Sequence, residues 1–259
     1  MLNIEKNIQS IETKQKNGQE KQENNFLYFY PNNHISISAL QLFDACPLNF
    51  YLRYYLNIKF PEPSRVKLGS QFQAILNAKY ADESYKGLLA AIDINERKTA
   101  SELVKKANSF KNIISIDSPY QVDLGLGIPV KFVPDLVVGL ITPNGKSSLV
   151  IENKYTSGYY NKNMVNEQKQ GTVYYIGIKK IYGLETNVIY QIFNHKSKKV
   201  ELIEVERKTQ KDIDTLLFWM DKKLSQIEKC NNTGIWDIGS HSKFICDLGP
   251  NCPVNYKVS

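Results

Sequence analysis

The interpretation of this chain depends on residues 149–157, which read LVIENKYTS. Three apolar residues, typical of a buried strand, lead directly into Glu152, Asn153 and Lys154. Successive side chains of a strand point to opposite faces, so Glu152 and Lys154 share one face, about 6.5–7 Å apart, and Asn153 points the other way. A carboxylate and an ammonium at the end of an apolar strand need a chemical explanation.

A second carboxylate, Asp135, lies in another apolar run, KFVPDLVVGL. Residues 130–155 are predicted to form two strands around a PNGKSS turn, whose Asn-Gly pair tolerates positive φ. This hairpin would bring Asp135 within reach of Glu152. Two carboxylates and one lysine in an apolar setting are costly unless they are paired or bound to a metal. An ion pair with Lys154 would satisfy one carboxylate only, so the pattern favours a metal site.

Carboxylate oxygens select Mg²⁺ or Mn²⁺, which keep bound waters and bind substrate phosphate in the remaining positions. Such a metal lowers the pKa of a water and neutralises charge that develops on the phosphate. A lysine beside it can position or deprotonate the attacking water and stabilise the transition state. Phosphodiester hydrolysis is the reaction that Asp135, Glu152 and Lys154 suit.

The composition also favours a partner that carries phosphate groups, though weakly. The 259 residues carry a net charge of +7 with a pI near 9.0, which favours an anionic partner such as nucleic acid. A solvated lysine-rich surface explains the charge about equally well. No apolar run approaches the roughly 18–20 residues needed to span a bilayer, and no apolar signal core begins the chain. We therefore expect no membrane partner and a cytoplasmic location, in the host cytoplasm if the protein is phage-encoded.

The expected organisation is a disordered polar tail over residues 1–25, followed by one domain over 26–259. Within it we expect a helical cap at about 36–115, a catalytic core at about 116–228 and a cysteine-containing segment at 229–259. The predicted fold class is α/β, with a mixed central sheet flanked by helices and a helical N-terminal cap.

Local signals place the individual elements. Ser38 is expected to cap the first of two short helices, and Pro47 suits the first turn of the second. Thr209-x-x-Asp212 has the spacing of a capping box and opens a final long helix. The other predicted elements are helices at 65–81, about 95–114 and about 165–182, and paired strands at 187–194 and 199–207.

The arrangement of Asp135, a hairpin and Glu152-Asn153-Lys154 resembles the PD-(D/E)XK nuclease superfamily, and Pro134-Asp135 matches its leading dipeptide. Within this superfamily the chain resembles the RecB-like branch, which includes small CRISPR-associated exonucleases and AddB-type nuclease domains. The resemblance covers about residues 36–252. It implies a restriction-endonuclease-like core.

Two further motifs carry the resemblance. The branch has a Gln-x-x-x-Tyr motif on the helix after the lysine strand, here Gln170 and Tyr174, which a spacing of four places on one helix face. In the family these residues contact DNA or position the active-site groups. The branch also has Gly-x-x-x-His near its N-terminus, but the residue four after Gly69 is Gln73, not the metal-binding histidine. An amide oxygen can ligate a hard cation, though less well than histidine suits Mn²⁺.

Many family members also hold a [4Fe–4S] cluster, which one N-terminal cysteine and a C-terminal Cys-x2-Cys-x5-Cys ligate. Three cysteines of this chain are in register with that pattern: Cys46, Cys246 and Cys252. The fourth position is Lys243, and Cys230 or His241 would have to replace it. The alternative is a set of inert thiols, and the sequence leaves both open. We expect His34, His195 and His241 in surface or loop roles.

The resemblance implies a Mg²⁺- or Mn²⁺-dependent deoxyribonuclease that acts as an exonuclease on single-stranded DNA or duplex ends. Its context would be DNA repair, recombination, replication or phage or CRISPR DNA processing, with a helicase or recombination protein as partner. The alternative is a catalytically weak or inactive nucleic-acid-binding protein that retains the fold, which Gln73 favours. A structural protein without nucleic acid is a third alternative, and the paired carboxylates argue against it.

Overall fold

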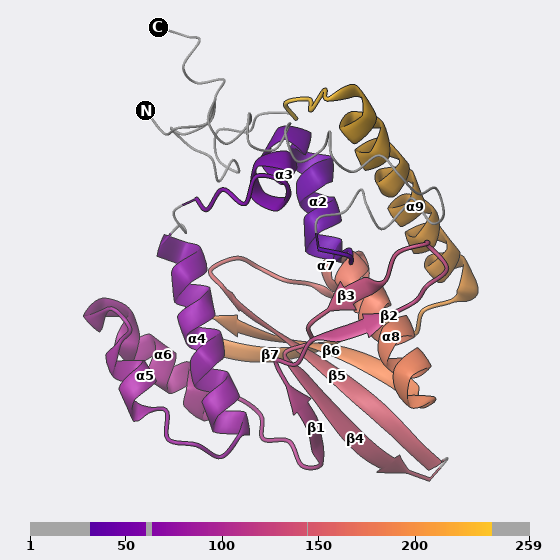
Figure 1. Ribbon diagram of the computed structural model, residues 1–259. Helices are drawn as coiled ribbons and strands as arrows, with labels where there is room; N and C mark the ends of the chain where they lie inside the picture. Colours follow the sequence, from indigo (N-terminus) through magenta and orange to yellow (C-terminus); the bar gives the residue numbers. More distant parts are fainter. Residues whose placement is uncertain (1–31, 61–63, 144, 240–259) are drawn as a thin grey trace, which may run out of the picture. The chain divides into compact units, whose positions relative to one another are not determined.

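A computed structural model describes residues 32–60, 64–143 and 145–239 (Figure 1). The chain divides into two compact units. The smaller comprises Met1–Phe60 with Lys223–Ser259, and the larger comprises Pro61–Lys222. The predicted tail at 1–25 lies outside the described residues, and the single domain over 26–259 stays a prediction.

The larger unit is built on a five-stranded sheet of order β1-β4-β5-β6-β7. The sheet is mixed, as predicted. Strands β5 and β6 are parallel, and the other neighbours are antiparallel. The bounds of the strands are Ile113–Ile116 for β1, Leu136–Thr142 for β4, Gly145–Thr156 for β5, Glu185–Asn194 for β6 and Lys199–Glu204 for β7.

The predicted hairpin is formed by β4 and β5. Their register runs from Thr142 opposite Gly145 to Leu136 opposite Ile151. Gly145 has φ +113°, a conformation that glycine adopts without steric cost. Asn144, the other residue of the predicted Asn-Gly turn, lies outside the described residues. Because β4 begins at Leu136, β5 continues past its partner on that side. The residues that follow Ile151 are therefore accessible to other groups.

The strand predicted to run through residue 134 is broken. A short strand, β3 (Val130–Phe132), pairs with β2 (Tyr120–Val122) in a separate two-stranded sheet. Pro134 lies between β3 and β4, and a proline has no N–H to donate to a ladder. The break places Asp135 immediately before β4, at the end of the sheet.

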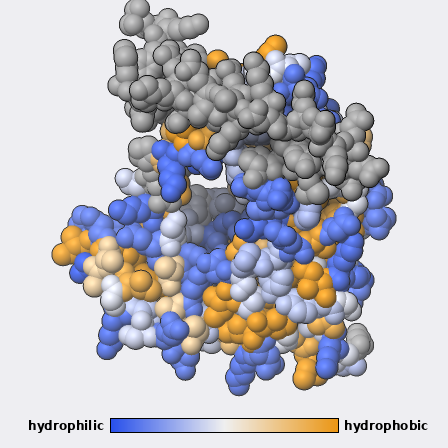
Figure 2. Space-filling view, in the orientation of Figure 1, coloured by the Kyte–Doolittle hydropathy of each residue, from blue (hydrophilic) through white to orange (hydrophobic). Residues whose placement is uncertain are grey.

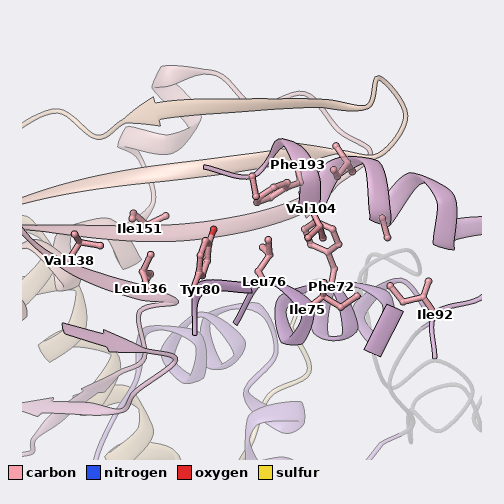
Figure 3. Close-up of a cluster of buried hydrophobic side chains, with 13 residues drawn as sticks. Phe72, Ile75, Leu76, Tyr80, Ile92, Val104, Leu136, Val138, Ile151 and Phe193 are labelled. Atoms are coloured by element: carbon pink, nitrogen blue, oxygen red, sulfur yellow. The ribbon is translucent and has the colours of Figure 1, made fainter. Parts of the chain in front are cut away.

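One face of the sheet is covered by α4 (Ser64–Tyr80), α5 (Lys86–Ala90) and α6 (Ile94–Lys106) (Figure 1). The i, i+3, i+4 spacing of Phe72, Ile75 and Leu76 directs three apolar side chains of α4 to one side. They pack against the sheet in the cluster of Figure 3, which also contains Leu136, Ile151 and Phe193. Full burial of such a side chain stabilises the fold by about 1.5–3 kcal/mol. This packing fixes α4 beside the strand that carries Glu152.

Helix α6 ends at Lys106, not near residue 114 as predicted. Ala107 is extended, with φ −59° and ψ 136°. The ammonium of Lys79 donates to the carbonyl oxygens of Val104 and Ala107, at 2.8 and 2.6 Å. These bonds satisfy terminal carbonyls that the helix cannot pair itself. The chain then enters β1, which the sequence analysis missed.

The other face is covered by α8 (Lys169–Tyr182), which follows the short helix α7 (Lys162–Asn166). The predicted single helix over 165–182 is therefore two helices. The backbone of Gln168 is extended, which separates them. At Gly177 an added Cβ would lie 2.5 Å from the ring of Phe132, so only a glycine permits this approach of α8 to β3.

The smaller unit contains α2 (Ile37–Ala45), α3 (Pro47–Tyr54) and the end of α9 (Gln210–Thr233). Pro47 occupies the first turn of α3, as predicted. The cap of α2 is Ser36, not Ser38, because the Ser36 hydroxyl accepts from the N–H of Ala39 at 3.2 Å. Ser38 lies inside the first turn. None of the helices in the described ranges has both the length and the apolar character needed to cross a membrane.

Candidate active site

A pocket of about 880 Å³ lies in the larger unit, between α4, the end of β5 and the loop that follows β5. Its lining includes Gln73, Asp135, Glu152 and Lys154. Figure 2 shows this face hollowed beside α4, with hydrophilic residues around the hollow. The structure therefore brings together the predicted carboxylates, the lysine and the residue at the histidine position.

Glu152 and Lys154 form an ion pair on one face of β5, as the alternation of side chains predicts. Lys154 Nζ lies 2.5 Å from Glu152 Oε1, and Glu152 is only 4 % exposed. Burial alone would lower the pKa of Lys154, but the charge of Glu152 and its hydrogen bond, with Asp135, raise the pKa above its ordinary value. Lys154 is therefore a cation at neutral pH and acts here as a donor.

Gln170 and Tyr174 of α8 hold this ion pair from the side. The Tyr174 hydroxyl donates to Glu152 Oε2 at 2.8 Å. Gln170 accepts from Lys154 Nζ at 3.4 Å and donates to the Tyr174 hydroxyl at 2.5 Å. Burial, followed by the charges of Glu152 and Asp135, raises the pKa of Tyr174 well above its ordinary value, so the hydroxyl keeps its proton. Tyr174 thus holds one oxygen of Glu152, and Gln170 contacts both groups that bond Glu152, Lys154 and Tyr174.

The negative charge of Asp135 has fewer stabilising partners than that of Glu152. Its Oδ2 accepts from the N–H of Asn153 at 2.6 Å. Asn153 is the second β5 residue beyond the pairing with β4, which ends at Ile151. Burial and then the charge of Glu152 raise the pKa of Asp135 well above its ordinary value, although the Asn153 N–H and Lys154 oppose this shift. Lys154 neutralises one carboxylate of two. The site therefore has an excess of negative charge that a cation would relieve.

The sequence model of the PD-(D/E)XK nuclease superfamily matches residues 34–255, most of the chain. The chain belongs to this superfamily. The pocket brings together Asp135, Glu152 and Lys154, the residues that the sequence analysis predicted as the motif of this superfamily.

Solved structures resemble this nuclease in fold. A crystal structure from Eubacterium rectale, named as a putative exonuclease, has a TM-score of 0.60 at 13 % identity and covers 91 % of this chain and 94 % of its own. A crystal structure of SSO0001, at 13 % identity, covers 93 % of this chain and 91 % of its own, but its TM-score of 0.38 supports no argument. No curated protein gives a significant match.

The residues of the pocket suit the divalent metals that nucleases of this superfamily generally use. Asp135 and Glu152 offer carboxylate oxygens, and Gln73 offers an amide oxygen. Across the described ranges, no three His, Cys, Asp or Glu side chains form a metal site by themselves. A hard cation that keeps several waters and binds phosphate needs only one or two carboxylates. The donor set therefore fits Mg²⁺ better than a metal that requires a closed cage of protein ligands.

Three further pocket residues were not predicted as site residues. Asn77 lies four positions after Gln73 on α4, a spacing that could have indicated it. Asp117 follows β1, where the sequence analysis had placed the end of a helix, so no signal was available. His195 lies in the turn after β6, as the expected loop role requires, but it also borders the pocket.

Two of the predicted cluster ligands, Cys246 and Cys252, lie outside the described residues, and so does His241, the alternative to Cys230 as the fourth ligand. Cys46 is buried, and its sulfur accepts from the N–H of Asn49 at 3.4 Å as the cap of α3. Cys230 lies on α9 and is partly buried. Both belong to the smaller unit and are free thiols. The iron–sulfur cluster stays a prediction.

Proposed function

We propose that this nuclease is a Mg²⁺- or Mn²⁺-dependent DNA exonuclease of the RecB-like branch. One observation supports it above all. Asp135 and Glu152 share a pocket in which Lys154 forms an ion pair with Glu152, so among the described residues Asp135 has no ion-pair partner. A buried carboxylate without a counter-ion destabilises the fold unless a bound cation compensates its charge.

The proposed metal ligands are Asp135, Glu152 and Gln73. When bound, the cation neutralises charge that develops on the phosphate and lowers the pKa of the attacking water. The protonated Lys154 donates a hydrogen bond to a phosphate oxygen and stabilises the transition state. Gln170 and Tyr174 keep Lys154 and Glu152 in fixed orientations, so little reorganisation is needed during the reaction.

DNA is the proposed substrate, as single strands or duplex ends. The net charge of +7 attracts a polyanion, although this term alone does not distinguish DNA from RNA. The proposed context is repair, recombination, replication or phage or CRISPR DNA processing, with a helicase or recombination protein as partner. A [4Fe–4S] cluster on Cys46, Cys246, Cys252 and a fourth ligand belongs to the same proposal.

A second function is a nucleic-acid-binding protein that does not cleave. Gln73 favours it, since a glutamine replaces the family's metal-binding histidine. A weaker metal site would reduce cleavage and leave the surface that binds DNA intact.

The decisive experiment incubates end-labelled single-stranded, duplex and covalently closed circular DNA with the protein in Mg²⁺, Mn²⁺ or EDTA. We expect nucleotides to be released from ends in either metal, and closed circles to persist. Glu152→Gln should lower the rate at least about 10²-fold, because it removes a charged ligand. The variant keeps one acceptor oxygen for Lys154, and its NH₂ can donate to the Tyr174 hydroxyl. Glu201→Gln, an exposed position on β7, should cleave normally.

Cleavage by Glu152→Gln at the wild-type rate would show that the assigned site is wrong. Binding of DNA by the wild-type protein without cleavage in either metal would favour the second function instead. Rapid cutting of closed circles would contradict the exonuclease assignment but not the site.

A further inference from the structure

A chain of side-chain hydrogen bonds runs from the pocket to the loop after β1. Gln73 Nε2 donates to Asn77 Oδ1 at 2.8 Å, and Asn77 Nδ2 donates to Asp117 Oδ2 at 3.2 Å. All three residues line the pocket that holds Asp135 and Glu152. The chain therefore ends at the residue that stands in the position of the family's histidine.

The direction of these hydrogen bonds follows from the chemistry of the groups. An ionised carboxylate only accepts, so Asn77 must turn its NH₂ toward Asp117. The oxygen of Asn77 then faces Gln73, which must present its own NH₂ in turn. What remains for the pocket is Gln73 Oε1. The orientation of the two amides thus follows from the acceptor oxygen that Asp117 presents to Asn77.

We propose that Asn77 and Asp117 are positioning residues that hold Gln73 with its oxygen toward the carboxylates, so that an amide oxygen ligates the metal in place of a histidine. This inference rests on the metal site of the proposed function. Without the two residues the amide could rotate and present its NH₂, a donor, to a cation.

Asp117, the last residue of this relay, also contacts Asp135 through the main chain. The main-chain N–H of Asp117 donates to the main-chain oxygen of Asp135 at 3.0 Å. Asp117 has φ +45°, in the left-handed region that aspartate and asparagine tolerate better than most residues. The relay therefore couples the position of α4 to Asp135, the residue immediately before β4. The same set of hydrogen bonds therefore fixes the positions of Gln73 and Asp135 relative to each other.

The relay also predicts a metal preference. With Gln73 oriented in this way, every proposed protein ligand is an oxygen. An oxygen-only donor set suits Mg²⁺, whereas an imidazole would favour Mn²⁺ and softer ions. Gln73 would then change which metal ion the site prefers and would not abolish metal binding.

The test is calorimetric titration of the DNA-free protein with Mn²⁺ and with Mg²⁺ at 0.15 M salt, on two variants of Asp117. Asp117→Asn keeps an acceptor for Asn77, and Asp117→Gly removes it, while both accept positive φ. We expect Asp117→Gly to weaken metal binding by about three- to tenfold, the effect of losing one ordering hydrogen bond. Asp117→Asn should stay within about twofold of wild type.

Two controls separate positioning from other effects. Asp82→Gly removes an exposed aspartate that also has positive φ, at 57°, outside the pocket, and should leave affinity unchanged. In a Gln73→Ala background, Asp117→Gly should have no further effect, because the group that it positions is gone.

The outcomes distinguish the two proposals. Equal losses in Asp117→Asn and Asp117→Gly would mean that Asp117 acts through its charge or as a ligand, which overturns the relay. Wild-type affinity in Asp117→Gly, or a full effect of that change without Gln73, would overturn it as well. A wild-type protein that binds neither metal would instead contradict the proposed function.

Discussion

Asp135 and Glu152 face one pocket, but their surroundings give them different properties. Glu152 has partners for both oxygens, in Lys154 and Tyr174. Asp135 has the N–H of Asn153 and the repulsion of Glu152. A residue whose charged form is disfavoured in the metal-free state lowers the stability of that state at neutral pH. At the scale of single residues, we therefore expect Asp135 to lower the stability of the metal-free protein and to favour binding of a cation.

The first consequence is a stabilising variant. In EDTA at pH 8, Asp135→Asn should melt about 2–4 °C above wild type, the shift that about 1 kcal/mol produces in a chain of this size. The folded-state pKa of Asp135 is raised, so its contribution to stability is complete below the ordinary aspartate pKa and is lost as pH rises through the raised value. The advantage of the variant should therefore shrink as the pH falls.

Melting curves at several pH values, in EDTA and in excess Mg²⁺, provide the measurement. Mg²⁺ should raise the melting temperature of wild type and not that of Asp135→Asn. A variant that melts below wild type at pH 8 in EDTA would show that Asp135 is not destabilised in the metal-free fold.

At the scale of elements, α9 shows how a sequence motif becomes a helix start. The N–H of Thr209 donates to Asp212 Oδ2 at 2.8 Å, and the N–H of Asp212 lies 3.3 Å from the Thr209 hydroxyl, which accepts. This is the reciprocal bonding of a capping box, as the spacing predicted. The hydrogen bonds from the side chain and main chain of Thr209 lower the pKa of Asp212.

Asp212→Asn should therefore destabilise the protein by about 0.5–1 kcal/mol at pH 7. A depressed folded-state pKa contributes stability above the ordinary aspartate pKa, and that contribution is lost as pH falls through the lowered value. The difference from wild type should shrink from pH 7 to pH 3 in urea unfolding curves. Asp214→Asn is the matched control and should cost less at pH 7, because the Asp214 carboxylate accepts from the side chain of Gln210 and asparagine keeps an acceptor oxygen there. A difference that does not change with pH would contradict the role of the carboxylate.

Elements with local signals could be predicted from the sequence, and those that depend on distant contacts could not. The β4–β5 hairpin and the apolar side of α4 follow from turn residues and periodicity. The end of α6 depends on Lys79, which comes from another helix. Likewise Asp135, Glu152 and Lys154 could be identified by motif, whereas Asp117 enters the pocket only through the path of the chain after β1.

At the scale of the whole molecule, the smaller unit is assembled from both ends of the chain. Its described part packs Trp236 against Tyr51, with ring centroids 4.8 Å apart, and the N–H of Leu48 donates to the oxygen of Asp237 at 3.0 Å. Contacts between residues so far apart in sequence carry a large loop-closure cost. A cluster with ligands from both ends would offset that cost, because metal-binding free energy becomes folding free energy.

The cluster proposal predicts that anaerobically purified protein is brown and holds iron and sulfide in near-equal amounts. Cys46→Ser should bleach it, and limited proteolysis of the C-terminal segment should become faster. Serine is itself a good helix cap, so the hydrogen bond to Asn49 can persist and the loss can be assigned to the thiolate. Colourless, iron-free protein after anaerobic reconstitution would refute the cluster, and Cys46→Ser should then cost little stability.

The division of the chain also has a consequence for the order of folding during synthesis. The pocket residues all belong to the stretch from Val66 to His195, whereas the smaller unit needs residues that follow Lys222. Domains fold as units while the chain emerges from the ribosome, starting from the N-terminal side. The acidic centre can therefore be complete on a nascent chain whose last segment is still inside the ribosome. For a protein that cuts nucleic acid, the smaller unit is then the last part to close, after the chemistry is already in place.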